Sequence, residues 1–216
     1  MIATKRLVLR SLLAAACAFS AALPLQTAWA ADASAPDTLI RQLSLETLET
    51  VKSDKAIQAG DLQKIINLVD GKVMPHVNFQ RMTSSAVGRF WRQATPEQQQ
   101  RLQDEFKTLL VRTYAGALTQ VKDQTIALRP LRASPSDTEV VVKTEIRGKG
   151  DPIQLDYRLE KSGAVWKIYD VNVLGIWLAD QYRNSFSQEI GANGIDGLIK
   201  ALAERNQKAA AAGGKA

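Results

Sequence analysis

Side chains that could carry catalysis are scarce in this sequence. The chain of 216 residues has one histidine, His76, and one cysteine, Cys17. A lone histidine beside Pro75 is more typical of a structural role than of a general base, and the two residues are too few for a Cys/His zinc cluster. The sequence also lacks a Gly-x-Ser-x-Gly elbow, a Gly-x-x-x-x-Gly-Lys-Ser/Thr phosphate loop and a Ser-x-x-Lys pair. We therefore expect no enzyme activity, no catalytic residues, no metal site and no cofactor.

Charged side chains offer two weaker possibilities. Asp156 and Glu160 are spaced like an acid–base pair, but they alternate with apolar residues and should lie on a wet face as solvated charges. Arg89, Arg92 and Lys143 are candidates for contacts with a phosphate group. The sequence has no Lys/Arg cluster with interleaved aromatic residues, so nucleic-acid binding is not predicted.

The first 30 residues have the pattern of a secretory signal peptide. Lys5, Arg6 and Arg10 precede an apolar run over residues 11–25, and small residues flank the position after Ala30, where we expect cleavage. The apolar run is shorter than the roughly 20 residues that span a bilayer. The pattern predicts export to the periplasm.

Cleavage after Ala30 changes the composition of the mature chain. It removes Cys17, so no disulfide is possible, and Ala14, three residues before that cysteine, argues against lipidation there. It also removes three basic residues, which leaves 25 basic and 22 acidic side chains and a net charge of +3. The remaining length suits one domain over residues 31–205, followed by a low-complexity tail over residues 206–216.

Helical periodicity governs the first half of the mature chain. Amphipathic helices are predicted over residues 37–51, after Asp61 and after Asn78. The clearest helix begins at a Thr-x-x-Gln capping box that starts at Thr95, with proline in the first helical position. Beyond it, apolar residues with helical spacing form one continuous stripe from residue 102 to residue 121. This stripe must pack against another element, and we expect its partner to be the region of alternating residues that follows it, over positions 126–173.

Alternating residues over positions 126–173 predict about four strands joined as an antiparallel meander. Turn residues over 148–151 and 162–163 separate neighbouring strands. Helical spacing returns after Gly175 and is broken over residues 191–194. The predicted fold class is therefore α+β, with a curved antiparallel sheet covered on one face by several helices.

A curved sheet under a helical cover can enclose an apolar pocket, and the two apolar faces supply its candidate lining. Trp91 and Trp166 suit either a core position or the mouth of such a pocket. The candidate lining residues come from the long helix, the sheet and the later helix: Phe106, Leu110, Tyr114, Leu118, Val140, Val142, Leu155, Tyr157, Leu159, Tyr182 and Phe186.

Four groups of residues, in order along the chain, resemble the MlaC family of periplasmic phospholipid carriers, also called toluene-tolerance proteins. Asn78 stands where that family is expected to favour aspartate, but both residues cap helices well. The groups are VMPHVNF at 73–79, AVG at 86–88 with WRQATPEQ at 91–98, FKTLLVRTY at 106–114, and DV at 170–171 with Gly175 and NGIDGLI at 193–199.

The resemblance implies a function and partners that composition and spacing do not supply. It implies a phospholipid ligand, and transport between an outer-membrane lipoprotein–porin complex and an inner-membrane ABC lipid transporter with a ring-forming lipid-binding subunit. Such transport would maintain the lipid asymmetry of the outer membrane. A carrier that moves between two docking sites is most simply a monomer.

A physical argument favours a carrier independently of the resemblance. Two acyl chains contain about 30 methylenes, and exposing them to water costs about 24 kcal/mol at roughly 0.8 kcal/mol each. Two alternatives remain. A periplasmic adaptor would bind a protein partner without lipid, and an enzyme would need a titratable group inside the pocket, where the identified faces have none.

Overall fold

The computed structural model describes residues 35–134 and 136–213. The predicted signal peptide, its cleavage site and Cys17 lie outside the described residues. Every described element belongs to the unit Ala31–Ala216. Among the described residues, no helix is both long and apolar enough to cross a membrane.

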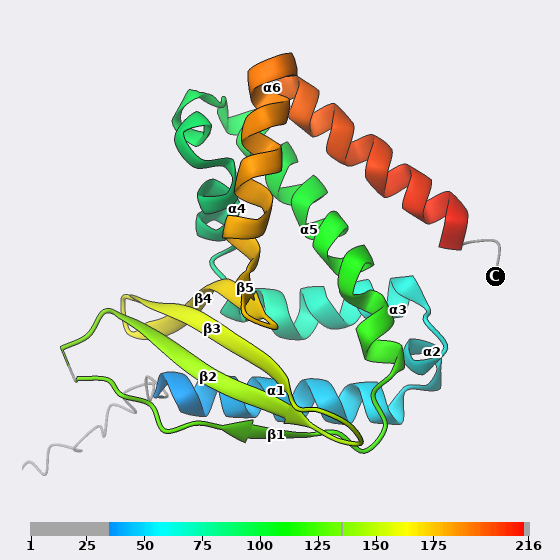
Figure 1. Ribbon diagram of the computed structural model, residues 1–216, viewed down its shortest axis with the longest axis vertical. Helices are drawn as coiled ribbons and strands as arrows, with labels where there is room; N and C mark the ends of the chain where they lie inside the picture. The colour runs from blue at the N-terminus through cyan, green and yellow to red at the C-terminus, as the bar shows by residue number, and fades with distance from the viewer. Residues whose placement is uncertain (1–34, 135, 214–216) are drawn as a thin grey trace, which may run out of the picture. The chain divides into compact units, whose positions relative to one another are not determined.

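An antiparallel meander of five strands forms the sheet, as the alternating sequence predicts (Figure 1). The strands follow one another across the sheet in chain order: β1 Thr125–Leu128, β2 Glu139–Arg147, β3 Ile153–Ser162, β4 Val165–Val173 and β5 Ile176–Trp177. Gly150 (φ 106°) and Gly163 (φ 62°) provide positive φ angles in the two predicted turns. The short β5, which pairs with the end of β4, is the strand that the pattern missed.

The first helix, α1 (Pro36–Ser53), covers one face of the sheet, which we call the inner face. In Figure 1 this helix lies along β1 and β2, the strands with which it makes contact. Its stripe packs against alternate residues of β2, β3 and β4, because successive strand side chains point to opposite faces. We call this group the sheet core: Leu39, Ile40, Leu43, Val140, Val142, Leu159 and Ile168.

Short helical segments connect α1 to the middle of the chain. These are α2 (Lys55–Gln58), α3 (Leu62–Leu68), a π-helical turn η1 (Val69–Val73) and a 3₁₀ turn η2 (Met74–His76). Asp61 caps α3 as predicted, since its carboxylate accepts a hydrogen bond from the Lys64 amide at 3.1 Å. This segment forms a small core with the end of α1, which we call the α3 core: Val51, Ile57, Ile65 and Leu68.

Two further helices begin at the predicted caps. Asn78 caps α4 (Phe79–Val87), which ends at Gly88 (φ 66°) and continues as the 3₁₀ helix η3 (Gly88–Gln93). Thr95 and Gln98 form the complete capping box of α5 (Pro96–Thr119), in which each side chain bonds the other residue's backbone amide. Both helix starts are therefore determined locally.

The last element, α6 (Leu178–Gly213), is a kinked helix that packs on α4 and α5. Gly194 has non-helical angles (φ 72°) where the sequence predicts a break, and Figure 1 shows the ribbon turning there. The helix continues into the predicted low-complexity tail, where Asn206 is buried and donates to the Glu105 carbonyl at 3.0 Å. Its apolar side joins α4 and α5 in the helical core: Met82, Ala86, Val87, Leu102, Phe106, Leu109, Tyr182, Phe186, Ile190, Leu198, Ile199 and Leu202.

Candidate functional site

The inner face of the sheet is apolar but unequally covered. Val142 and Leu159 are fully buried under α1, as predicted for one apolar face. Tyr157 pairs with Val142 on one side and with Val171 on the other, and both Tyr157 and Val171 are only half-buried. Leu155, two residues before Tyr157 on the same face, is half-buried as well. This part of the inner face is therefore accessible although it points into the fold.

The stripe of α5 is divided between the helical core and the α3 core. The expectation that it would pack on the sheet is wrong, because α1 covers that face instead. Phe106 belongs to the helical core and is completely buried. Leu118, three turns later, packs against the α3 core. Leu110 and Tyr114 lie between them on the helix and are half-buried, with Leu110 at the edge of the helical core. The middle of α5 thus presents apolar side chains that no core fully covers.

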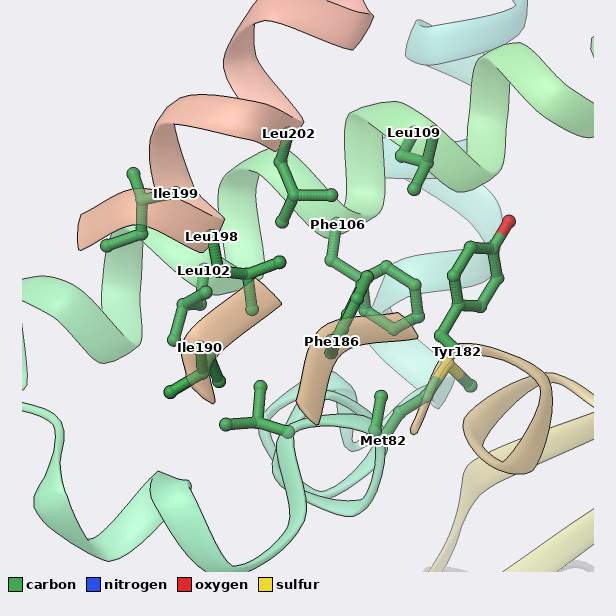
Figure 2. Close-up of a cluster of buried hydrophobic side chains, with 12 residues drawn as sticks. Met82, Leu102, Phe106, Leu109, Tyr182, Phe186, Ile190, Leu198, Ile199 and Leu202 are labelled. Carbon is green, nitrogen blue, oxygen red and sulfur yellow. The ribbon is translucent and has the colours of Figure 1, made fainter. Parts of the chain in front are cut away.

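Three predicted lining residues form an aromatic group inside the helical core (Figure 2). The Phe106 ring lies 5.0 Å from the Tyr182 ring and 5.3 Å from the Phe186 ring, both in edge-to-face geometry. Phe79 adds a tilted contact at 5.8 Å. Each of these rings packs against the others, so in this structure they are core residues.

Half-buried apolar side chains lie at the edges of the helical core and the sheet core, which Val77 and Val171 connect. Val77 and Val171 pack against both cores, Leu110 against the helical core and Tyr157 against the sheet core. We call these four residues the interior junction. Sequence reasoning missed the two valines. Val171 could have been found because β4 alternates, whereas Val77, between a 3₁₀ turn and a helix cap, carries no periodic signal.

The interior junction is uncharged. Burial raises the pKa of the Tyr157 phenol to about 12, against a weaker opposing effect of its hydrogen bond with Ser44. Burial also raises the pKa of Tyr114, with a smaller contribution from Tyr182. Both phenols are neutral at pH 7, so the site suits an apolar ligand with a few hydrogen-bonding points.

The outer face of the sheet carries buried charge, which corrects the expectation of solvated carboxylates. Asp156 is only 4% exposed and accepts hydrogen bonds from the Thr144 amide at 3.1 Å and the Gln154 side chain at 2.7 Å. Glu160 is half-buried and pairs with Arg81. The alternating pattern gives the face of each residue correctly, but neighbouring side chains decide its solvation.

Asp170 joins this outer face to the beginning of α6. Its carboxylate accepts hydrogen bonds from the Val171 amide at 2.9 Å, the Ala179 amide at 3.1 Å and Arg158 Nη1 at 3.0 Å. Burial raises the pKa of Asp170 and outweighs those three contacts, each of which acts to lower it. The carboxylate therefore anchors the helix to the sheet at the edge of the helical core.

Two hollows open elsewhere on the described surface. One of about 640 Å³ lies on the outer side of the sheet, where Lys143 and Arg158 line it. The other, of about 450 Å³, is lined by Arg89, Arg92 and Trp91 among others. The three basic residues singled out in the sequence are thus in two separate places, neither of them at the interior junction. Trp166 packs against the sheet core.

Catalytic groups do not converge within residues 35–134 and 136–213. His76 ends the η2 turn, and no hydrogen bond of its side chain is found in this part of the chain. No group of three potential metal-ligating side chains occurs there either.

Comparison with known proteins gives consistent matches over most of the chain. A family model described as MlaC protein matches residues 41–204. The toluene tolerance protein ttg2D of Pseudomonas putida is 28% identical over 196 residues, which cover 88% of this chain and 90% of that protein. The intermembrane phospholipid transport system binding protein MlaC of Haemophilus influenzae is 22% identical over 170 residues, 77% of this chain and 79% of that one.

A solved structure is similar as well. It is that of the phospholipid-binding protein from Ralstonia solanacearum in complex with a phospholipid. The two chains are 47% identical with a TM-score of 0.80, and the match covers 82% of this chain and 99% of the other. The α+β arrangement is common to both.

Proposed function

This chain belongs to the MlaC family, and we propose that it is a phospholipid carrier that holds acyl chains in an apolar pocket around the interior junction. The observation that carries the proposal is the similarity to a protein whose structure contains a phospholipid, at 47% identity over nearly all of that protein. The unequal burial of the inner face supports it, because a packed core leaves few apolar side chains both inward-facing and accessible.

Within the predicted lining, we assign the first contacts with lipid to the half-buried residues. Leu110, Tyr114, Leu155 and Tyr157 offer accessible apolar surface without displacement of a core. Leu118 extends this surface toward the α3 core. The remaining predicted residues form the walls behind it, so a large ligand would reach them only if the helical core and the sheet core moved apart: Phe106, Val140, Val142, Leu159, Tyr182 and Phe186.

We further propose that the protein works in the periplasm as a monomer, after removal of residues 1–30. It would move phospholipid between an outer-membrane lipoprotein–porin complex and an inner-membrane ABC lipid transporter with a ring-forming lipid-binding subunit. The name of the Haemophilus influenzae relative, an intermembrane phospholipid transport system binding protein, supports this role.

Organic extraction of the purified protein, followed by mass spectrometry, tests the proposal. A carrier should release phospholipid in a roughly stoichiometric amount. A protein that is folded and monomeric but free of lipid, and that also fails to take up phospholipid from vesicles, would support the adaptor alternative instead.

A matched pair of variants on β4 tests the position of the site. Val171→Trp places a large ring at the interior junction and should lower the phospholipid content severalfold, because the ring would occupy the volume of the proposed acyl-chain pocket. Val165→Trp adds the same ring on the same strand, where the native side chain is 46% exposed, and should leave the content unchanged. Equal lipid content in both folded variants would place the ligand elsewhere.

A further inference from the structure

The smaller hollow is strongly basic and lies apart from the interior junction. Its lining comes from the consecutive elements α4 and η3 and from α6, which contacts both. Arg183 on α6 lies 98 residues after Ser85 on α4. No carboxylate is among the lining residues, which are Ser84, Ser85, Gly88, Arg89, Trp91, Arg92 and Arg183. The proposed acyl-chain site uses none of these side chains, although Gly88, Trp91 and Arg92 belong to the groups that resemble the MlaC family.

Arg183 is held in position at this hollow. Its Nε donates to the Ser85 carbonyl at 3.0 Å, across the contact between α6 and α4. Its Nη2 lies 3.3 Å from the Asp180 carboxylate, the one acidic partner of the group. Since α4 ends at Gly88, the contact with Ser85 also satisfies a carbonyl of the last helical turn. One face of the guanidinium is thereby fixed.

The other two guanidinium groups are not neutralised. Arg89 and Arg92 are exposed and take part in no ion pair within the described part of the chain. Three guanidinium groups against the single carboxylate of Asp180 leave a local excess of two positive charges. Arginines in or next to the sheet differ in this respect, since Arg129, Arg147 and Arg158 are each paired with a carboxylate.

Serine hydroxyls complete a suitable set of donors and acceptors. Ser84 donates its hydroxyl to the Arg81 carbonyl at 2.9 Å, while no hydrogen bond of the Ser85 hydroxyl is found among the described residues. Guanidinium groups match phosphate oxygens in geometry and form charge-assisted hydrogen bonds with them. A concave surface with several guanidinium groups and a free hydroxyl therefore has the chemistry of a phosphate site.

We propose that this hollow binds a phosphate group, either that of a phospholipid headgroup at the surface of a bilayer or that of a free phosphate. The site is separate from the proposed acyl-chain site and goes beyond the proposed carrier function. On a bilayer it would orient the α4–η3–α6 side of the domain toward the headgroups.

The test compares Arg89→Ala/Arg92→Ala with a charge-matched control, Arg101→Ala/Arg205→Ala. All four arginines are exposed, and the control pair lines neither hollow. Arg183 is left unchanged because its contact with Ser85 is structural. Circular dichroism and thermal unfolding should show that both double variants fold normally.

Two probes distinguish the sources of phosphate. Inorganic phosphate is titrated while the arginine Nε–H signals are followed by NMR, and sedimentation measures binding to phosphatidylcholine vesicles with and without phosphatidylglycerol. In the wild-type protein the Arg183 signal should shift with phosphate, or the protein should sediment with the anionic vesicles. Removing two basic residues at a headgroup surface should weaken vesicle binding about 30-fold, and the control should change it little.

Each outcome decides the proposal. Response to inorganic phosphate alone assigns a free phosphate, and response to anionic vesicles alone assigns a lipid headgroup, provided that Arg89→Ala/Arg92→Ala abolishes it. Equal weakening by both double variants would mean that only net charge matters, and the proposal would be overturned. It would also be overturned if the wild-type protein bound neither probe. Lipid extraction measures the carrier function separately, so the two proposals can fail independently.

Discussion

Phe106 and Leu110 lie one turn apart on α5, yet we expect their substitution by alanine to affect different properties, stability in one case and lipid content in the other. Phe106 is fully buried among three aromatic rings at 5.0 to 5.8 Å, whereas Leu110 is half-buried at the interior junction. Phe106→Ala should therefore reduce the stability of the lipid-free protein and Leu110→Ala its lipid content. Together the two variants separate core from ligand-binding surface.

The expected loss in the free energy of unfolding follows from how deeply each side chain is buried. Truncating a buried phenylalanine to alanine costs about 3 to 5 kcal/mol, and three lost aromatic contacts place Phe106→Ala toward the upper end. That is a large part of the roughly 5 to 15 kcal/mol that stabilises a typical domain. For a domain of this size the melting temperature should fall by about 2 to 4 °C per kcal/mol. Leu110→Ala should cost less, about 1 kcal/mol, because its side chain is only half-buried.

Urea unfolding of the delipidated variants, followed by circular dichroism, measures both free energies, and an unchanged m-value shows that the folded state is comparable. Mass spectrometry of extracts from the undelipidated proteins gives their phospholipid content. If Phe106→Ala keeps its stability but loses its lipid, the ring contacts the lipid directly and is not part of the core. Phe106 and Leu110 would then both belong to the ligand-binding surface.

Three further outcomes are expected. Leu174 (φ 52°) and Gly175 (φ 92°) form the two-residue turn between β4 and β5, where positive φ angles strain leucine and favour Asn-Gly. Leu174→Asn should therefore raise the melting temperature by about 2 to 4 °C in thermal unfolding. An unchanged melting temperature would show that Leu174 is not strained. Thr95→Ala should cost about 1 kcal/mol in urea unfolding through loss of the α5 capping box, and Thr119→Ala, at the other end of the helix, should cost less. Burial raises the pKa of Asp170 above its ordinary value of 3.8, so the folded state holds this proton more tightly than the unfolded state. The wild-type protein should therefore lose stability relative to Asp170→Asn as the pH rises from below 4 through the folded pKa, and a difference that is independent of pH would refute the assignment.

Local signals in the sequence determined most of the secondary structure. The caps at Asp61, Asn78 and Thr95 and the alternation in β2 and β3 were predicted correctly, because each depends on residues within a few positions of one another. The α+β class follows from the order of these elements. The missing strand β5 is only two residues long, which is too short for alternation to be recognised.

Tertiary packing decided which apolar residues are core and which are accessible. A helical stripe has the same spacing whether it faces a protein core or a ligand, so the sequence could not divide α5 between Phe106 and Leu110. The sequence also did not predict that Arg183 lies near Arg89 and Arg92, or that Asp156 is buried although it lies on the polar face of the sheet. Burial and the proximity of charges depend on elements distant in the chain, whereas caps and periodicity depend on neighbours.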